Sequence, residues 1–149
     1  TRFQDMGAEA FLIAATLNTA ISQRLARKIC PDCRVSVAIP AKQIEKVRSA
    51  LAGIPSNYFS GGLNQKNPEF MKGQGCESCG RSGYQGRIAV AEVLAVTPEI
   101  QQLISENYTP AKAMELAGKQ GMITLFQDGL LKAMLGFTTL EEVMRIAEE

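Results

Sequence analysis

Four cysteines are the residues of this chain whose type and spacing best suit a chemical role. They form two Cys-x-x-Cys pairs, Cys30 with Cys33 in CPDC and Cys76 with Cys79 in CESC. This spacing lets both thiolates of a pair reach one ion from a tight turn, and two pairs supply the four ligands of a closed tetrahedral zinc site. The sequence contains no histidine, so the ligands are sulfur alone. We therefore predict a structural Zn²⁺ site at these four cysteines.

Other interpretations of the cysteines stay open at this point. They are four free buried thiols, a dithiol redox motif at CPDC, iron in the same ligand set, and disulfides in a secreted protein. A redox motif needs a helix after the first pair, whereas residues 34–39 (RVSVAI) are typical of extended chain. The paired spacing argues against free thiols and disulfides. Iron is compatible with the spacing, but nothing else in the sequence indicates electron transfer.

The segment between the two cysteine pairs is unusually long. It contains 42 residues, 34–75, whereas a compact zinc ribbon has about 15–20 residues between its pairs. Within it, residues 40–52 are expected to form a helix that starts at Pro40 and ends at Gly53. Residues 55–68 are rich in Ser, Asn and Gly and predict a loop. We expect a metal ion to clip the base of this inserted excursion.

Composition and charge limit the class of protein. With 149 residues, 46% of them hydrophobic, the chain can bury one sizeable core or a core with a smaller satellite. A formal net charge of +1 argues against a nucleic-acid partner, because such proteins usually carry a strong basic excess. No apolar run predicts a membrane span, and the first residues lack the pattern of a signal peptide. We expect a cytoplasmic chain, and its start in mid-pattern suggests a piece of a longer protein.

Hydrophobic periodicity predicts the elements that flank the cysteines. Residues 9–27 predict an amphipathic helix leading to the first pair. Its apolar stripe recurs every four positions and consists of Ile13, Leu17, Ile21 and Leu25. After the second pair, the glycines of GRSGYQGR predict a turn, and residues 88–96 predict a mostly buried strand. Glu92 is the one charge in that strand and needs a partner if it is buried.

The rest of the chain is predicted to be helical. Thr-Pro pairs supply an N-cap and a first-turn proline for helices that start at residues 98 and 110. Residues 124–135 predict a third helix, although Gly129 weakens that prediction. The last helix begins near Thr139, which forms a capping box with Glu142. The methionines of this part are expected to fill the core; they are Met114, Met122, Met134 and Met144.

The sequence lacks the common catalytic constellations. It has no G-x-x-x-x-G-K-[ST] phosphate loop. Without histidine there is no Ser-His-Asp or Cys-His arrangement. We assign no catalytic residue and expect no catalysis by this chain alone.

Three segments resemble a known family. They are FLIAATLNTAISQRLARKICPDC, CESCGRSGYQGRIAVAEVL and FQDGLLKAMLGFTTLEEVMRIAEE, in that order. Together they resemble the C-terminal part of the secretion ATPases of type II secretion and type IV pilus assembly, the GspE/PilB kind. The resemblance runs from Arg2 to Glu149, and its most specific pieces are QRLARKICPDC and CESCGRSGYQGR, which combine the cysteine pairs with characteristic flanking residues.

The resemblance implies an α+β, mostly α-helical fold. Residues 1–29 and 86–97 would form the margin of a RecA-like ATPase core, residues 30–85 a tetracysteine zinc-binding insertion, and residues 98–149 a C-terminal helical subdomain. The family's zinc motif carries over onto Cys30, Cys33, Cys76 and Cys79. The related retraction motors lack the cysteine insertion, so its presence favours assembly or secretion over retraction.

For function, the resemblance implies a hexameric cytoplasmic motor that hydrolyses ATP at the inner-membrane face. Its partners would be neighbouring subunits and inner-membrane platform proteins, with peripheral rather than spanning membrane association. The family's phosphate loop and Walker B segment lie before the equivalent of Thr1, so ATP and Mg²⁺ belong to the parent protein only. Arg24 and Arg87, which flank the insertion, are candidates for contact with nucleotide or a neighbouring subunit, as an alternative to pairing with carboxylates such as Glu92.

A second class of function is a stand-alone zinc-dependent interaction or nucleic-acid-binding module. It rests on a local basic cluster around the first cysteine pair, which consists of Arg24, Arg27, Lys28 and Arg34. The same cluster has a simpler interpretation, because four positive charges can offset the net charge of −2 on a Zn(Cys)₄ centre. The near-neutral chain and the scarcity of aromatic residues among these basic ones count against nucleic acid.

Overall fold

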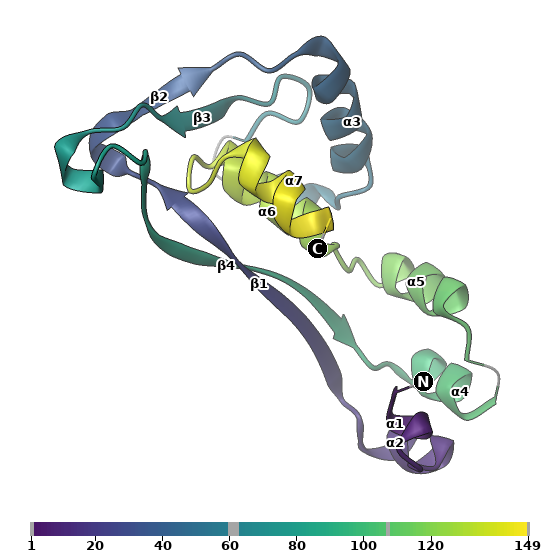
Figure 1. Ribbon diagram of the computed structural model, residues 1–149. Helices are drawn as coiled ribbons and strands as arrows, with labels where there is room; N and C mark the ends of the chain where they lie inside the picture. Colours follow the sequence, from purple (N-terminus) through teal and green to yellow (C-terminus); the bar gives the residue numbers. More distant parts are fainter. Residues whose placement is uncertain (1, 60–62, 107, 149) are drawn as a thin grey trace. The chain divides into compact units, whose positions relative to one another are not determined.

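A computed structural model describes residues 2–59, 63–106 and 108–148 of the chain (Figure 1). It is an α+β structure, with β1 (Thr19–Ile29) and β4 (Tyr84–Ala95) in one two-stranded sheet and β2 (Arg34–Val37) and β3 (Phe70–Gly73) in another. The chain divides into two compact units. Unit 1 comprises Thr1–Ser22 and Glu92–Ile123, and unit 2 comprises Gln23–Ala91 and Thr124–Glu149.

The helix predicted over residues 9–27 is wrong. The chain instead forms the short helix α2 (Ala10–Thr16), turns to extended backbone at Leu17, and enters strand β1. The apolar stripe misled the prediction because its later members do not share a buried face: Ile21 is 65% exposed and Leu25 is 50% exposed. Pairing with β4 decides the conformation, and the Val96 amide donates to the Asn18 carbonyl at 2.9 Å just before β1 begins.

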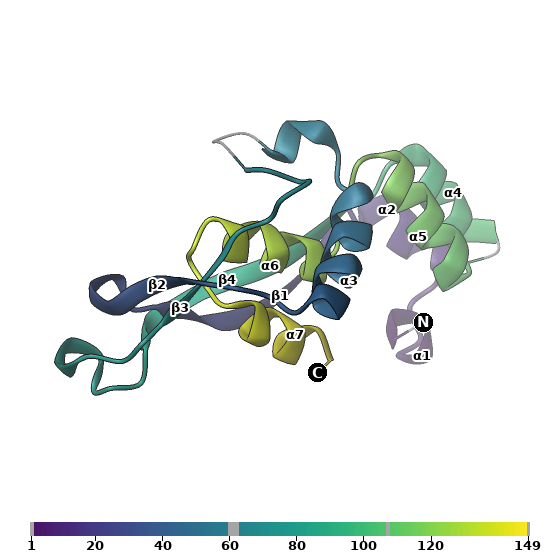
Figure 2. The same cartoon turned by 90° about the horizontal axis from the view of Figure 1, so that it is seen from above.

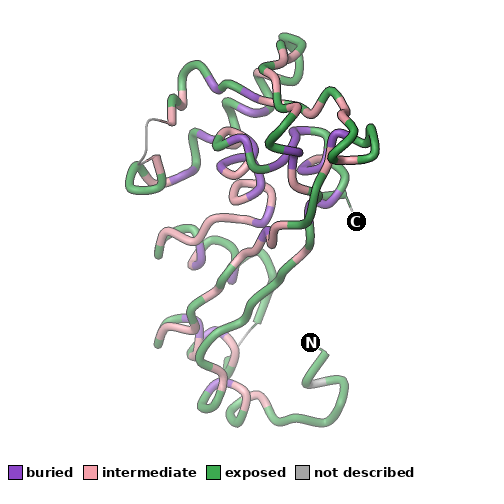
Figure 3. Tube along the Cα trace, turned by 90° about the vertical axis from the view of Figure 1, so that its left-hand side faces the viewer, coloured by how far each residue is buried: buried purple, intermediate pink, exposed green. Residues whose placement is uncertain are grey.

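The strand predicted after the second cysteine pair is confirmed, but its burial is not. Strand β4 begins earlier than expected, at Tyr84. Among its residues only Val90 is fully buried, whereas Val93 is 50% exposed. Figure 3 shows the exposed and intermediate positions that predominate along both long strands. The apolar residues on both faces therefore correctly indicated a strand. They did not indicate that both faces of the strand are buried.

Unit 1 contains α1 (Arg2–Asp5), α2, α4 (Pro98–Glu106) and α5 (Pro110–Lys119). Helix α4 packs against α2 and α5. Both helices start where the Thr-Pro pairs predict, and the Thr109 hydroxyl accepts from the Lys112 amide at 3.4 Å. Few of the described residues of the unit are buried, and most of these are small. They are Ala14, Ile100, Leu103, Ala113 and Ala117. Met114 is 53% exposed, so the prediction that it fills the core is wrong. Met122, Met134 and Met144 are half-buried rather than part of the buried core.

Unit 2 contains α3 (Ala41–Ala52), α6 (Leu125–Met134) and α7 (Leu140–Glu148) with the cysteine-bearing segments. Helix α6 packs against α3, α7 and β3 (Figure 2). Gly129 explains the close approach of α6 and α7, since a Cβ there would lie 2.8 Å from Val143 Cγ1. The glycine that weakened the prediction of α6 is therefore required by packing. A cluster of buried residues forms the hydrophobic core of this unit. It comprises Ala26, Val90, Leu125 and Ile146, with the partly buried Ile88 packed against it.

The remaining helix predictions are confirmed. Helix α3 follows Pro40 and closes at Gly53. Thr124 caps α6 and forms a capping box with Gln127, whose side chain also donates to the Ala50 carbonyl at 3.0 Å. Within the described residues, no helix is both long and apolar enough to span a bilayer.

Candidate metal centre

The antiparallel sheet of β2 and β3 brings the two cysteine pairs together. Strand β2 begins directly after Cys33, and its first residue, Arg34, lies opposite Gly73, the last residue of β3. The Gln74 amide donates to the Cys33 carbonyl at 3.0 Å. The short 3₁₀ turns Pro31–Cys33 and Glu77–Cys79 therefore meet at one end of this sheet (Figure 1). The pairs lie at the base of the long excursion, as their spacing predicts.

The four cysteine sulfurs form one compact cluster, and all lie within 4.8 Å of one another. Sγ of Cys30 is 3.8 Å from that of Cys76, Sγ of Cys33 is 4.0 Å from that of Cys79, and Cys76 and Cys79 are 3.7 Å apart. A regular tetrahedron with Zn–S bonds of about 2.3 Å has sulfur atoms about 3.8 Å apart. The cysteines are free thiols, which removes the disulfide interpretation, and the donor set fits a tetrahedral thiolate-binding metal ion.

Backbone amides point at two of the sulfurs. Cys33 Sγ accepts from the Gly75 amide at 3.3 Å, and Cys79 Sγ accepts from the amides of Cys76 at 3.2 Å and Gly83 at 3.3 Å. The Cys76 amide, followed by that of Gly83, lowers the pKa of Cys79 to about 6. Such donors favour the thiolate, which is the form that binds metal.

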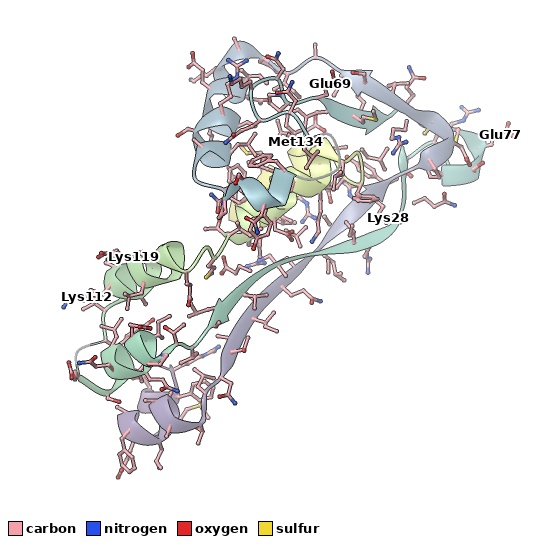
Figure 4. The ribbon with its side chains drawn as sticks, turned by 180° about the vertical axis from the view of Figure 1, so that it is seen from behind. Lys28, Glu69, Glu77, Lys112, Lys119 and Met134 are labelled. Carbon is pink, nitrogen blue, oxygen red and sulfur yellow. The ribbon has the colours of Figure 1, made fainter. Side chains whose placement is uncertain are left out.

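Cys30 differs from the other three cysteines because it is completely buried. Burial raises the pKa of the Cys30 thiol to about 12, since a lone thiolate would lose its hydration. A divalent cation among the sulfurs would supply the missing positive charge. Figure 4 labels Glu77, the first residue of the 3₁₀ turn that ends at Cys79.

Glycines let the backbones approach closely beside the cluster. A Cβ at Gly73 would clash with the Gly83 carbonyl oxygen, and Gly83 has a φ of +77°. The Cys30 amide donates to that same Gly83 carbonyl at 2.9 Å. The glycine-framed turn predicted after the second pair is thus confirmed, and Gly83 connects it to the first pair.

An ion-pair network around a buried carboxylate holds the strand that leads to Cys30, and the sequence did not reveal it. Glu142 of α7 is 2% exposed, and its carboxylate accepts from the side chain of Arg27 at 2.6 Å and from its backbone amide at 3.0 Å. Arg145 donates to both carboxylate oxygens at 3.2 and 3.1 Å. The Arg27 guanidinium also stacks over the Tyr84 ring, 4.1 Å from its centroid.

These contacts hold Glu142 ionised. Burial opposes ionisation, but hydrogen bonds from Arg27 and Arg145 outweigh it and lower the pKa of Glu142 to about 2. The capping box predicted for this helix is half correct. Thr139 Oγ accepts from the Glu142 amide at 3.2 Å, whereas the Glu142 carboxylate turns to the arginines.

Some of the basic residues near the first cysteine pair have partners outside the sulfur cluster. Arg27 pairs with Glu142, and Arg34 donates to the Gly136 carbonyl at 3.4 Å. Arg24 and Lys28 are half-buried on β1, and Arg87 is exposed on β4. Arg27 and Arg34, which were expected to help offset a Zn(Cys)₄ charge, therefore have defined contacts elsewhere.

Comparison with known proteins places the chain. The model of the family described as "Type II/IV secretion system protein" matches residues 1–145, and the chain belongs to this family. It is 39% identical over 144 residues to the type IV pilus assembly ATPase PilB of Thermus thermophilus, covering 97% of this chain and 15% of that protein.

Two further relatives show similar agreement. The chain is 36% identical over 149 residues to PilB of Pseudomonas aeruginosa, which covers 100% of this chain and 24% of that protein. It is 35% identical over 147 residues to a putative type II secretion system protein E of Escherichia coli, which covers 99% of this chain and 27% of that protein. The chain therefore spans less than a third of the length of these relatives.

Proposed function

We propose that Cys30, Cys33, Cys76 and Cys79 hold one structural Zn²⁺. The observation that supports this proposal is the sulfur cluster, in which all four sulfurs lie within 4.8 Å of one another and three of the pairs are 3.7–4.0 Å apart, close to the spacing of tetrahedral coordination. A bound Zn²⁺ would supply positive charge to the thiolates and fix the two turns to each other. Iron in the same ligands is the competing occupant, and elemental analysis separates the two metals.

We further propose that the chain is the C-terminal zinc-binding and coupling segment of a hexameric cytoplasmic ATPase that powers type II secretion or type IV pilus assembly. Relatives with those printed names match it along almost its whole length. ATP and Mg²⁺ would bind in the preceding part of the protein, so this segment positions and couples but does not catalyse. Its partners would be neighbouring subunits and inner-membrane platform proteins, with no nucleic acid among them.

The proposed organisation follows the family resemblance. Residues 1–29 and 86–97 would border a RecA-like core, residues 30–85 would be the metal-pinned insertion, and residues 98–149 would form the C-terminal subdomain. Arg24 and Arg87 would contact nucleotide or a neighbouring subunit. Replacing each with Ala in the complete protein tests their role, and unchanged ATP turnover in both variants would refute it.

The experiment for the proposed function begins with the complete reading frame. It should contain a phosphate loop upstream of Thr1, and the purified product should hydrolyse ATP and assemble as a hexamer. A Lys→Ala change in that loop should abolish turnover, while the present chain alone should show none. A reading frame without a phosphate loop, or a product without ATP turnover, would overturn the motor function while leaving the zinc site to be judged by metal analysis.

A further inference from the structure

The residues just before Cys30 are held by the start of α7. The backbone of Arg27 is bonded on both sides, since its amide donates to Glu142 and its carbonyl accepts from the Thr138 hydroxyl at 2.8 Å. Two residues later, the Ile29 amide donates to the Phe137 carbonyl at 2.9 Å. The segment that leads into the buried cysteine therefore takes its position from residues 137–142.

The chain that leaves the second cysteine pair contacts the same helix start. The Gly83 carbonyl accepts from the Cys30 amide, and the next residue, Tyr84, has its hydroxyl 3.1 Å from Thr139 Oγ. The Tyr84 ring also supports the Arg27 guanidinium. The residues at the start of α7 thus contact both β1, which leads to Cys30, and β4, which leaves the second cysteine pair.

Glu142 is the residue on which these contacts converge. Its buried carboxylate binds the backbone and side chain of Arg27, three residues before Cys30, although it contacts no cysteine itself. Without the Glu142 carboxylate, the Arg27 backbone amide would lose its acceptor and the Arg27 side chain its ion pair, so this part of β1 would lose two of its restraints. A change at Glu142 therefore reaches the sulfur cluster through the strand that carries Cys30.

We propose that Glu142 is a positioning residue for the metal centre, so that metal occupancy and the docking of α7 stabilise each other. This inference rests on the proposed zinc site. Because such linkage is reciprocal, loosening α7 must weaken metal binding by the same factor by which removing the metal loosens α7. Metal binding would then determine how well ordered α7 is, although α7 lies outside the cysteine insertion in the sequence.

Zinc affinity gives the first test, measured on the whole chain by competition with a chromogenic chelator. We expect Glu142→Gln to weaken zinc binding about tenfold or more, within the usual range of coupling between sites. Glu141→Gln is the matched control, since it removes the same charge from an exposed neighbour on the same helix. It should change the affinity less than about twofold. Equal affinities for Glu142→Gln and wild type would overturn the proposal.

General destabilisation needs its own control. Asp128→Asn also removes a carboxylate that accepts from a backbone amide, that of Ala91 at 2.8 Å, but on α6 and away from the strand end at Cys30. We expect it to leave zinc affinity within about threefold of wild type. If Asp128→Asn weakened zinc binding as much as Glu142→Gln, Glu142 would have no special position.

Hydrogen exchange tests the reverse direction in the wild-type chain. Removing zinc with a chelator should speed exchange at the amides of α7 more than at those of α5 in unit 1. Should Glu142→Gln fail to fold, Tyr84→Phe provides a milder variant, because it deletes only the hydroxyl contact with Thr139. If exchange in α7 did not change when zinc was removed, the proposed linkage would be wrong, although the zinc site itself could still be correct. If the wild-type chain bound no zinc, both the zinc site and the linkage would be refuted.

Discussion

The two compact units of the chain bury different kinds of atoms. Unit 2 encloses a sulfur cluster, a buried carboxylate and two threonine hydroxyls, all of which have defined partners. Unit 1 buries mainly alanine and a few aliphatic side chains. It exposes a set of large apolar ones, which are Phe3, Met6, Phe11, Leu12, Ile21, Val93, Tyr108 and Met114. We therefore expect replacement of single buried polar residues to lower the stability of unit 2 strongly. Replacement of single exposed apolar residues should change the stability of unit 1 little.

The largest expected effect comes from the cysteines. Cys30→Ser should abolish stoichiometric zinc binding, because the buried thiolate is lost from a four-ligand site. Structural zinc contributes on the order of 10 kcal/mol of folding free energy in small domains, so exchange in α6 and α7 should rise strongly. Exchange in α4 and α5 of unit 1 should hardly change. A variant that retains one zinc and wild-type exchange would show that Cys30 is not a ligand.

The next effect comes from the buried ion pair. Glu142→Ala removes a buried carboxylate and its hydrogen bonds from Arg27 and Arg145, whose side chains are 53% and 47% exposed. The arginines left behind can be hydrated, so we expect the cost of the lost charge-assisted hydrogen bonds alone, about 1.5–3 kcal/mol. Urea unfolding monitored by circular dichroism measures the loss. A cost below about 1 kcal/mol would show that the network contributes no more than a surface pair.

The dependence of stability on acid pH should reveal the contribution of the same carboxylate, that of Glu142. The folded-state pKa of Glu142, about 2, lies below its ordinary value of 4.5. Its contribution is therefore present above pH 4.5 and is lost as the pH falls from 4.5 through 2. The loss amounts to about 2–3 kcal/mol. The charges that face Glu142 are Arg27 of β1 and Arg145 of α7, beside the Tyr84 ring.

Comparing wild type with Glu142→Gln isolates this acid step. Unfolding free energies measured from pH 6 to 2 should fall less steeply for the variant, because it has no carboxylate to protonate at this position. Parallel profiles would show that another group causes the acid sensitivity.

A smaller effect is expected where α6 and α7 pack in unit 2. Gly129→Ala places a methyl group 2.8 Å from Val143 Cγ1, and such overpacking costs about 1–3 kcal/mol. Gly118→Ala is the matched control, since nothing lies within 4 Å of a Cβ there. Thermal unfolding should separate the two variants, and equal midpoints would contradict the close packing.

The smallest effect belongs to unit 1. Phe11 is 59% exposed on α2, so Phe11→Ser should change the free energy of unfolding by no more than about 0.5 kcal/mol. A loss above about 1 kcal/mol would show that this side chain is covered in the protein in solution, and the contrast between the units would weaken.

Local signals in the sequence predicted much of this molecule. Caps and first-turn prolines placed α4 and α5, Pro40 and Gly53 bounded α3, and the Cys-x-x-Cys spacing identified the four sulfurs that the structure brings together. Each of these signals acts within a few residues of chain. The metal site was visible in the sequence because its ligands are chemically distinctive.

Long-range pairing could not be predicted in the same way. Ile21 and Leu25 fit a helical stripe, yet pairing with β4 makes their segment a strand. Glu142 fitted a capping box, yet its carboxylate meets Arg27, which lies 115 residues away in the chain. A local pattern contains no information on such distant partners, so both errors have the same origin.

The central claim is that the four cysteines bind one zinc ion together. Native mass spectrometry of the reduced, zinc-supplied chain, combined with thiol alkylation, tests it most directly. We predict one Zn²⁺ per chain, with all four cysteines protected from alkylation until a strong chelator removes the metal. Less than about half an equivalent of zinc, or four cysteines that react freely in its presence, would contradict the claim.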